Sequence, residues 1–319
     1  MLATKFALRY AVERMAESQI ASVLRTLLVN GYVVTKADRI SERVAVISVQ
    51  KRDRLGGVAA SSILFADAPT ENIMEMLGKT AEENGAQTLV VTTAKLDQKQ
   101  VPTIAPQKFY DLLGGEIRSE RLMREDLPDL LDAFGHNKLY HGFKESPDDL
   151  LEDYVKEGLQ FLLESRAYRY GQDRLFESLP DGLVLGRQKL NLYFDAKAYE
   201  KGFHPSADDI KRFSSYVNEF NDRYERFVGR LHSFLVVSGS FPADAKALEE
   251  KATEFYSLCS TKLCLITGKD LGHIINDVRT QCKNRSAIKW TKIFSQLLIK
   301  PGSIASELRR IKKDNIVGD

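Results

Sequence analysis

The 319-residue sequence contains no apolar run near the 18 residues that a membrane-spanning helix needs. Lys5 and Arg9 interrupt the N-terminal segment, which therefore lacks the continuous apolar core of a secretory signal. There are only three cysteines, without the Cys-x-x-Cys spacing of zinc or redox sites: Cys259, Cys264 and Cys282. These absences predict a cytoplasmic protein with reduced thiols and no membrane partner.

Neither sign of charge dominates, because 46 Lys and Arg residues nearly balance 44 Asp and Glu residues. The distribution is less even. Six acidic residues and one lysine lie between Glu145 and Glu157, a composition typical of a solvated helix face. Ten basic residues and one acid lie between Arg279 and Lys313. This basic segment is either a solvated surface or a face that follows a phosphate backbone through Lys283, Arg285, Lys289 and Lys292.

The chain is long enough for two domains of ordinary size, and its 43% apolar content supports real cores. We predict an α/β module over residues 1–115, an acidic helical connector over 116–157, and a second α/β domain over 158–319. Within the first module the pattern predicts helices over 1–30 and 70–84 and strands over 44–49, 59–65 and 88–93.

This succession of helix, strands, helix and strand resembles a degraded nuclease domain of the Mrr type, which could serve in recognition or assembly. The similar features are the Gly31-Tyr32 pair after the first helix and Thr92-Thr93 at the end of a late strand. Where that family carries its acids and lysine, this sequence has Ser48-Val49-Gln50 followed by Lys51. A generic α/β domain is the alternative. Both interpretations leave the first module without a catalytic set.

The most informative stretch is a pair of short apolar runs around the polar turn Gly186-Arg187-Gln188-Lys189, which predicts a β-hairpin. Side chains two residues apart on a strand share a face, so Asp195 and Lys197 point the same way. With the turn centred near Gln188, Asp181 lies opposite Asp195 across the strand pair. Two carboxylates and a lysine then converge on one side of a sheet.

Facing carboxylates repel each other unless a cation lies between them, and hard oxygen ligands suit Mg²⁺, with Mn²⁺ as a substitute. The lysine could orient a water beside the metal or balance charge on a pentavalent phosphate. This is the layout of metal-assisted phosphodiester hydrolysis. The alternative is a surface hairpin with a cross-strand ion pair.

The segment Tyr193-Phe194-Asp195-Ala196-Lys197-Ala198-Tyr199 is followed by a long amphipathic helix and then by Phe234-Leu235-Val236-Val237-Ser238-Gly239-Ser240-Phe241. Here the sequence resembles the FokI cleavage domain, a family of type IIS restriction endonucleases. That family carries a Pro-Asp-Gly, a hairpin, an Asp-x-Lys-Ala-Tyr, a helix and a strand ending in Val-Ser-Gly-x-Phe. Each feature occurs here in the same order, over residues 168–279.

The resemblance implies a restriction-endonuclease-like (PD-(D/E)xK) α/β fold, in which helices flank a mixed sheet. It also implies an Mg²⁺-dependent DNA endonuclease of restriction or phage defence, with Asp181 and Asp195 as metal ligands and Lys197 as the catalytic lysine. DNA is then the partner, and a homodimer or a partner subunit would be needed for double-strand cleavage. The competing hypotheses are a catalytically silent DNA-binding or scaffold subunit and an RNase.

Overall fold

The computed structural model describes residues 25, 27–41, 44–52, 58–66, 72, 75, 79, 87–91, 103–104, 120–170, 179–186 and 190–317. The chain forms two compact units, one of residues 1–116 with 172–174 and one of residues 117–171 with 175–319. Across the described residues, no helix combines the length and the apolar character needed to cross a membrane.

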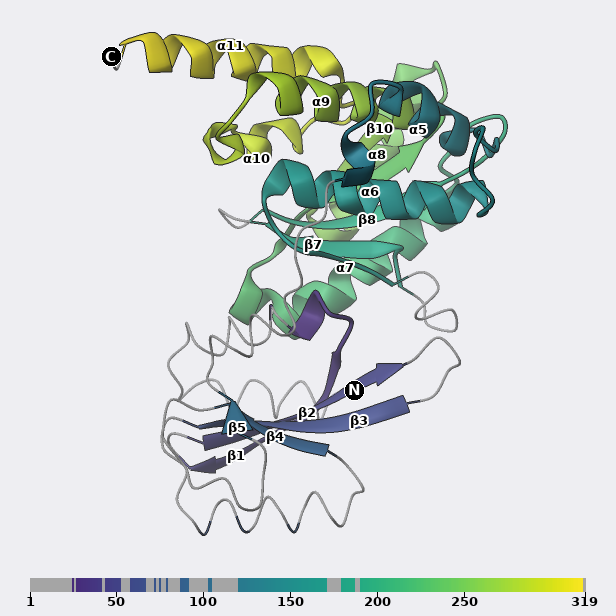
Figure 1. The fold of residues 1–319 in the computed structure, drawn as a ribbon. Coiled ribbons are helices and arrows are strands. Elements are labelled where there is room, and N and C mark those ends of the chain that lie inside the picture. The colour runs from purple at the N-terminus through teal and green to yellow at the C-terminus, as the bar shows by residue number, and fades with distance from the viewer. Residues whose placement is uncertain are drawn as a thin grey trace. The chain divides into compact units, whose positions relative to one another are not determined.

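The N-terminal unit contains a five-stranded mixed sheet (Figure 1). Its strands, in the order in which they neighbour one another, are β1 (Val33–Ser41), β2 (Val44–Arg52), β3 (Val58–Ala66), β4 (Gln87–Val91) and β5 (Thr103–Ile104). The first three strands pair antiparallel, and β4 and β5 extend the sheet in parallel.

The predicted strands over 44–49, 59–65 and 88–93 correspond to β2, β3 and β4. Strand β1 was not predicted, because Lys36, Asp38 and Arg39 break its apolar pattern. Helical residues occur at 25, 27 and 28 and again at 72, 75 and 79, within the two predicted helices. Most of those two helices lies outside the described residues.

The C-terminal unit has its own five-stranded sheet, in the order β10-β9-β8-β7-β6. The strands are β6 (Ala167–Arg169), β7 (Gly182–Leu185), β8 (Asn191–Lys197), β9 (Leu231–Ser238) and β10 (Lys262–Thr267). Strands β6, β7 and β8 are antiparallel neighbours, while β8, β9 and β10 run parallel. The helices are α5 (Leu127–Gly135), α6 (Pro147–Leu163), α7 (Ala207–Val228), α8 (Ala245–Cys259), α9 (Gly268–Gln281), α10 (Trp290–Ile293) and α11 (Pro301–Val317), with 3₁₀ turns at Glu120–Leu122 and Arg285–Ala287.

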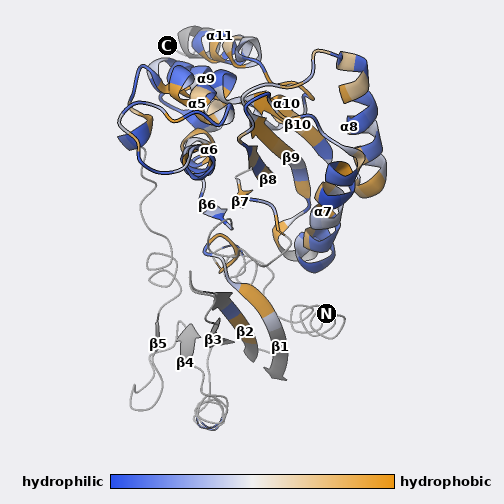
Figure 2. Ribbon diagram, turned by 90° about the vertical axis from the view of Figure 1, so that its right-hand side faces the viewer, coloured by the Kyte–Doolittle hydropathy of each residue, from blue (hydrophilic) through white to orange (hydrophobic). Residues whose placement is uncertain are grey.

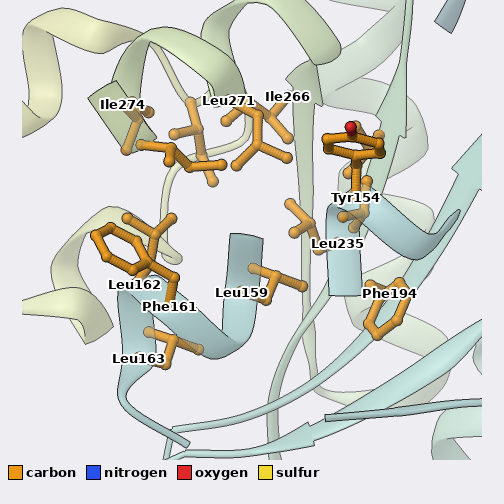
Figure 3. Close-up of a cluster of buried hydrophobic side chains, with 14 of the residues drawn as sticks. Tyr154, Leu159, Phe161, Leu162, Leu163, Phe194, Leu235, Ile266, Leu271 and Ile274 are labelled. Carbon is orange, nitrogen blue, oxygen red and sulfur yellow. The ribbon is translucent and has the colours of Figure 1, made fainter. Parts of the chain in front are cut away.

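Helices cover both faces of this sheet, with α5, α6 and α9 on one side and α7 and α8 on the other (Figure 2). Residues of α6, the sheet and α9 form the larger core, which Figure 3 shows around Leu159, Leu235 and Leu271. The opposite face packs aromatic rings, with Phe234 of β9 between Phe213 of α7 and Phe255 of α8. Because β8 is buried on both faces, its polar side chains need specific partners.

The long helix α7 begins as its sequence predicts. The Ser206 side chain accepts the Asp209 N–H at 3.1 Å, and the Asp209 carboxylate accepts the Ser206 N–H at 3.0 Å, which completes a capping box. The apolar stripe of this amphipathic helix is buried at Ile210, Phe213 and Val217. The adjacent helix α8 begins at Ala245, with Asp244 as its N-cap.

The predicted separate connector over 116–157 was wrong, because α5 and most of α6 are integral parts of the C-terminal unit. Leu130, Phe134 and Leu151 of these helices are fully buried in the larger core. The acidic residues of α6 obscured its apolar stripe in the sequence. Its acids form one face of the helix, and its apolar residues are buried in the larger core.

Candidate active site

The hairpin of β7 and β8 brings the predicted catalytic residues together. Gly182 of β7 pairs with Phe194 of β8, and one further step in this register places Asp181 opposite Asp195, as predicted. The Tyr170 N–H donates to the Asp181 carbonyl oxygen at 2.7 Å, so β6 holds the main chain of Asp181 from its other side. The site therefore lies where β7 begins and β8 ends.

Each charged side chain of this site has a defined partner. Lys197 Nζ donates to Asp195 Oδ1 at 2.6 Å, and the two side chains are only 17% and 4% exposed. Asp181 Oδ2 accepts the N–H of Ala196 at 2.7 Å. The main chain of β8 thus binds the Asp181 carboxylate through Ala196, between the two residues whose side chains pair with each other.

The electrostatics of the site favour an additional cation. Burial raises the pKa of Asp181 well above its usual value, and the charge of Asp195 raises it further. Burial acts to lower the pKa of Lys197, but the charges of Asp195 and Asp181 outweigh it, so the pKa of Lys197 is raised. The site thus favours the charged form of the lysine, and it sets two carboxylates against a single ammonium group.

The residues of the site fit a hard divalent ion through two carboxylates. Asp181 and Asp195 would supply oxygen ligands, the type that Mg²⁺ prefers. No cluster of three or more His, Cys, Asp or Glu side chains suited to a metal occurs in the described part of the chain. The remaining ligands would be water or phosphate oxygens, in keeping with the tendency of Mg²⁺ to retain several waters.

The Ser238-Gly239 pair after β9 supports the end of β8. The buried Ser238 hydroxyl donates to the Lys197 carbonyl oxygen at 2.7 Å. Gly239 lies so close to the end of α5 that a β-carbon there would be 2.5 Å from His136 Nδ1. The Tyr199 N–H donates to the Gly135 carbonyl oxygen at 3.1 Å. The Val-Ser-Gly signature therefore anchors the segment that carries Lys197.

Sequence reasoning missed a charged cluster next to the site, centred on Arg169 of β6. Its guanidinium donates to Glu152 at 2.5 Å, to Asp153 at 2.9 Å and also to Asp149, all on α6. Arg169 pairs with Gly182 in the β6–β7 register, directly beside Asp181. Burial raises the pKa of Glu152, while Arg169 acts to lower it. The spacing of the three acids was the available signal, since residues three and four apart share a helix face.

The predicted nucleic-acid-binding residues differ in their surroundings. Lys283 and Lys289 are exposed. Lys292 is 68% exposed and lies 3.8 Å from Glu307. Arg285 instead donates to Glu164 Oε1 at 3.0 Å and stacks 4.3 Å from the ring centroid of Phe161, so it holds the end of α6. Trp290 and Phe294 of the same segment are buried and serve as packing residues.

The fold and the hairpin together define a restriction-endonuclease-like α/β protein, a class of nucleases related to restriction endonucleases. The family model of the FokI cleavage domain matches residues 116–296, more than half of the chain. The chain therefore belongs to the FokI cleavage-domain family.

Among solved structures, the chain is similar to restriction endonuclease FokI bound to DNA, at 16% identity and a TM-score of 0.44, over 63% of this chain and 37% of that one. Another structure of FokI matches at 18% identity and a TM-score of 0.39, over 48% of this chain and 28% of that one. The chain thus spans little more than a third of the FokI chain. No curated protein matches the chain.

Proposed function

We propose that the chain is an Mg²⁺-dependent endonuclease that hydrolyses phosphodiester bonds in DNA, with Mn²⁺ as a substitute ion. The observation that carries the proposal is the meeting of Asp181, Asp195 and Lys197 at one end of a buried hairpin. Membership in the FokI cleavage-domain family supports the same reaction class.

In this mechanism the two carboxylates hold the metal and the lysine stabilises charge. The bound ion would polarise the scissile phosphate and activate a water for in-line attack. Lys197, which is fixed beside Asp195 and stays protonated, would lie against a phosphate oxygen or the attacking water. The N–H of Ala196 keeps the Asp181 carboxylate aimed at the same place. Burial of the site strengthens each of these charge interactions.

The test is cleavage of supercoiled plasmid by the full chain in Mg²⁺, followed by EDTA. Asp181→Ala, Asp195→Ala and Lys197→Ala should each abolish cleavage and keep the far-ultraviolet circular dichroism of the wild type. Asp148→Ala is the matched control, because Asp148 belongs to an exposed Pro-Asp pair at the start of α6. Wild-type cleavage by Asp195→Ala would refute the site. A preference for single-stranded RNA would instead favour an RNase.

We propose that Lys283, Lys289 and Lys292 bind DNA phosphates, since their side chains are exposed on the basic segment. Their combined alanine variant should weaken binding to all DNA sequences alike. The salt dependence of log K should flatten by about 0.9 for each phosphate that is no longer neutralised. Arg285→Ala is the control, because its pairing with Glu164 predicts reduced stability without a changed salt slope. An unchanged slope in the triple variant would assign these lysines to a solvated surface.

We propose that double-strand cleavage, in a setting of restriction or phage defence, requires two copies of the chain or one copy and a partner subunit. One active site would hydrolyse one phosphodiester bond, and the opposite strand runs antiparallel, so a second site related by a two-fold axis is needed. Linear product should therefore rise more steeply than the first power of enzyme concentration. In an equal mixture with Asp195→Ala, linear product should fall to about one quarter. First-order formation of linear product by a monomeric chain would contradict pairing.

A further inference from the structure

The two units of the chain have sheets of the same topology. In each unit a three-stranded antiparallel meander is followed by two strands that join in parallel, so that the strands neighbour one another in sequence order. The C-terminal sheet repeats these pairings from β6 to β10. Strand by strand, β1 corresponds to β6, β2 to β7, β3 to β8, β4 to β9 and β5 to β10.

The helical residues occupy equivalent places in the two connections that carry them. Residues 25, 27 and 28 precede β1, as α6 precedes β6. Residues 72, 75 and 79 lie between β3 and β4, where α7 lies between β8 and β9. The helices alone are weak evidence of a shared fold, because a parallel crossover normally needs one. The shared order and directions of all five strands are more specific evidence.

This correspondence identifies the positions that would carry catalysis in the N-terminal sheet. The catalytic strand β8 corresponds to β3, and not to β2, whose residues 48–51 align with the Mrr-type motif by sequence alone. The sequence of β3, Val-Ala-Ala-Ser-Ser-Ile-Leu-Phe-Ala, contains no charged residue. Asp67 follows β3 in sequence at the place that corresponds to Asp195, and Pro69 stands where the lysine of an Asp-x-Lys would be. Arg43 precedes β2 in the place that Asp181 occupies before β7.

We propose that the N-terminal unit is a second nuclease-type sheet that lacks two members of the catalytic set, the first acid and the lysine, so that it forms no active site of its own. This unit would then not hydrolyse the second strand of a DNA duplex. The active site for that strand would come from another chain. This inference rests on the proposed function only for its cleavage assay.

The experiment compares the full-length wild type with the full-length double variant Asp181→Ala/Asp195→Ala in two measurements. The first is nicking of plasmid in Mg²⁺ and in Mn²⁺. The second is calorimetric titration with Ca²⁺, a hard ion of the same ligand preference. We expect the double variant to lose all nicking and all Ca²⁺ binding, with Asp148→Ala like the wild type.

Residual nicking by the double variant would overturn the inference while the proposed nuclease function survived. If the wild type did not nick DNA, the proposed function would fail, and the Ca²⁺ titration would still decide the inference. Ca²⁺ binding that persists in the double variant would place an acidic site in the N-terminal unit and overturn the inference. Complete loss of binding in the double variant would support a single site.

Discussion

Gly182, the residue between Asp181 and the rest of β7, should be intolerant of even one methyl group. A β-carbon at this position would lie 2.1 Å from Cζ of Phe194 and 2.4 Å from the Tyr168 carbonyl oxygen. Ordinary van der Waals contact begins at 3.4 Å, so the ring would have to retreat by 1.3 Å and the β6 backbone by 1.0 Å. The ring fills the space over Gly182 and is fully buried, with no free volume to enter.

We therefore expect Gly182→Ala to lower the free energy of unfolding by about 1–3 kcal/mol, as overpacked cores do. We also expect cleavage to fall by about 10²-fold, because a shift near 1 Å in a reacting group has that effect. The physical reason is that Asp181 is bonded directly to Gly182, and its carboxylate must keep its place beside Asp195. Chemical denaturation gives the first quantity, and single-turnover cleavage of plasmid gives the second.

The matched control is Gly302→Ala in α11, where a β-carbon would meet nothing within 4 Å. That variant should be as stable as the wild type or more stable by up to about 1 kcal/mol, since alanine favours a helix over glycine. Phe194→Leu should restore part of the stability of Gly182→Ala by removing the ring contact. If Gly182→Ala kept both the stability and the cleavage rate of the wild type, the packing argument for the Pro-Asp-Gly motif would be refuted.

Two further predictions concern the supports of the site. Ser238→Ala should cost about 1 kcal/mol of stability and reduce cleavage, because it removes the hydrogen bond to the Lys197 carbonyl. The control is Ser233→Ala on the same strand, which should leave the cleavage rate unchanged. Arg169→Met should cost about 2–3 kcal/mol in a urea titration, because it removes the guanidinium that three α6 carboxylates share, although Asp153 keeps Arg121 at 3.8 Å. Arg124→Met breaks a pair with Asp126 whose two side chains are 36% and 40% exposed, so it should cost less, about 1 kcal/mol. Equal losses in the two arginine variants would contradict the role given to the Arg169 cluster.

The hairpin and its acids were predictable because their geometry is local. Strand alternation alone puts Asp195 and Lys197 on one face, and a short turn fixes which residue lies opposite Asp195. The structure keeps that register from Gly182 to Leu185. The capping box of α7 was predictable for the same reason, since it involves residues only three apart.

The remaining parts of the site depend on contacts between distant segments. Arg169 and its three acidic partners are separated by 16 to 20 residues, and the acidic run alone reads as a solvated helix face. Arg285 meets Glu164 across 121 residues, which removes it from the exposed basic set that its sequence neighbours suggest. Strand β6 has only three residues and carries no periodic signal. No local pattern encodes these pairings, because the packing of α6 on the sheet decides them.

On the proposed function, the cost of burying two facing carboxylates distinguishes the two sheets. In the C-terminal unit, burial raises the pKa of Asp181 well above its usual value, so the ionised pair is unfavourable unless a cation is bound. In the N-terminal sheet an arginine, Arg43, stands in sequence where Asp181 precedes β7, so a second carboxylate is missing there and the repulsion between two acids does not arise. The order and direction of the neighbours of β3 match those of β8. The topology thus sets where a nuclease site can form, and the side chains at the end of the third strand decide whether it does.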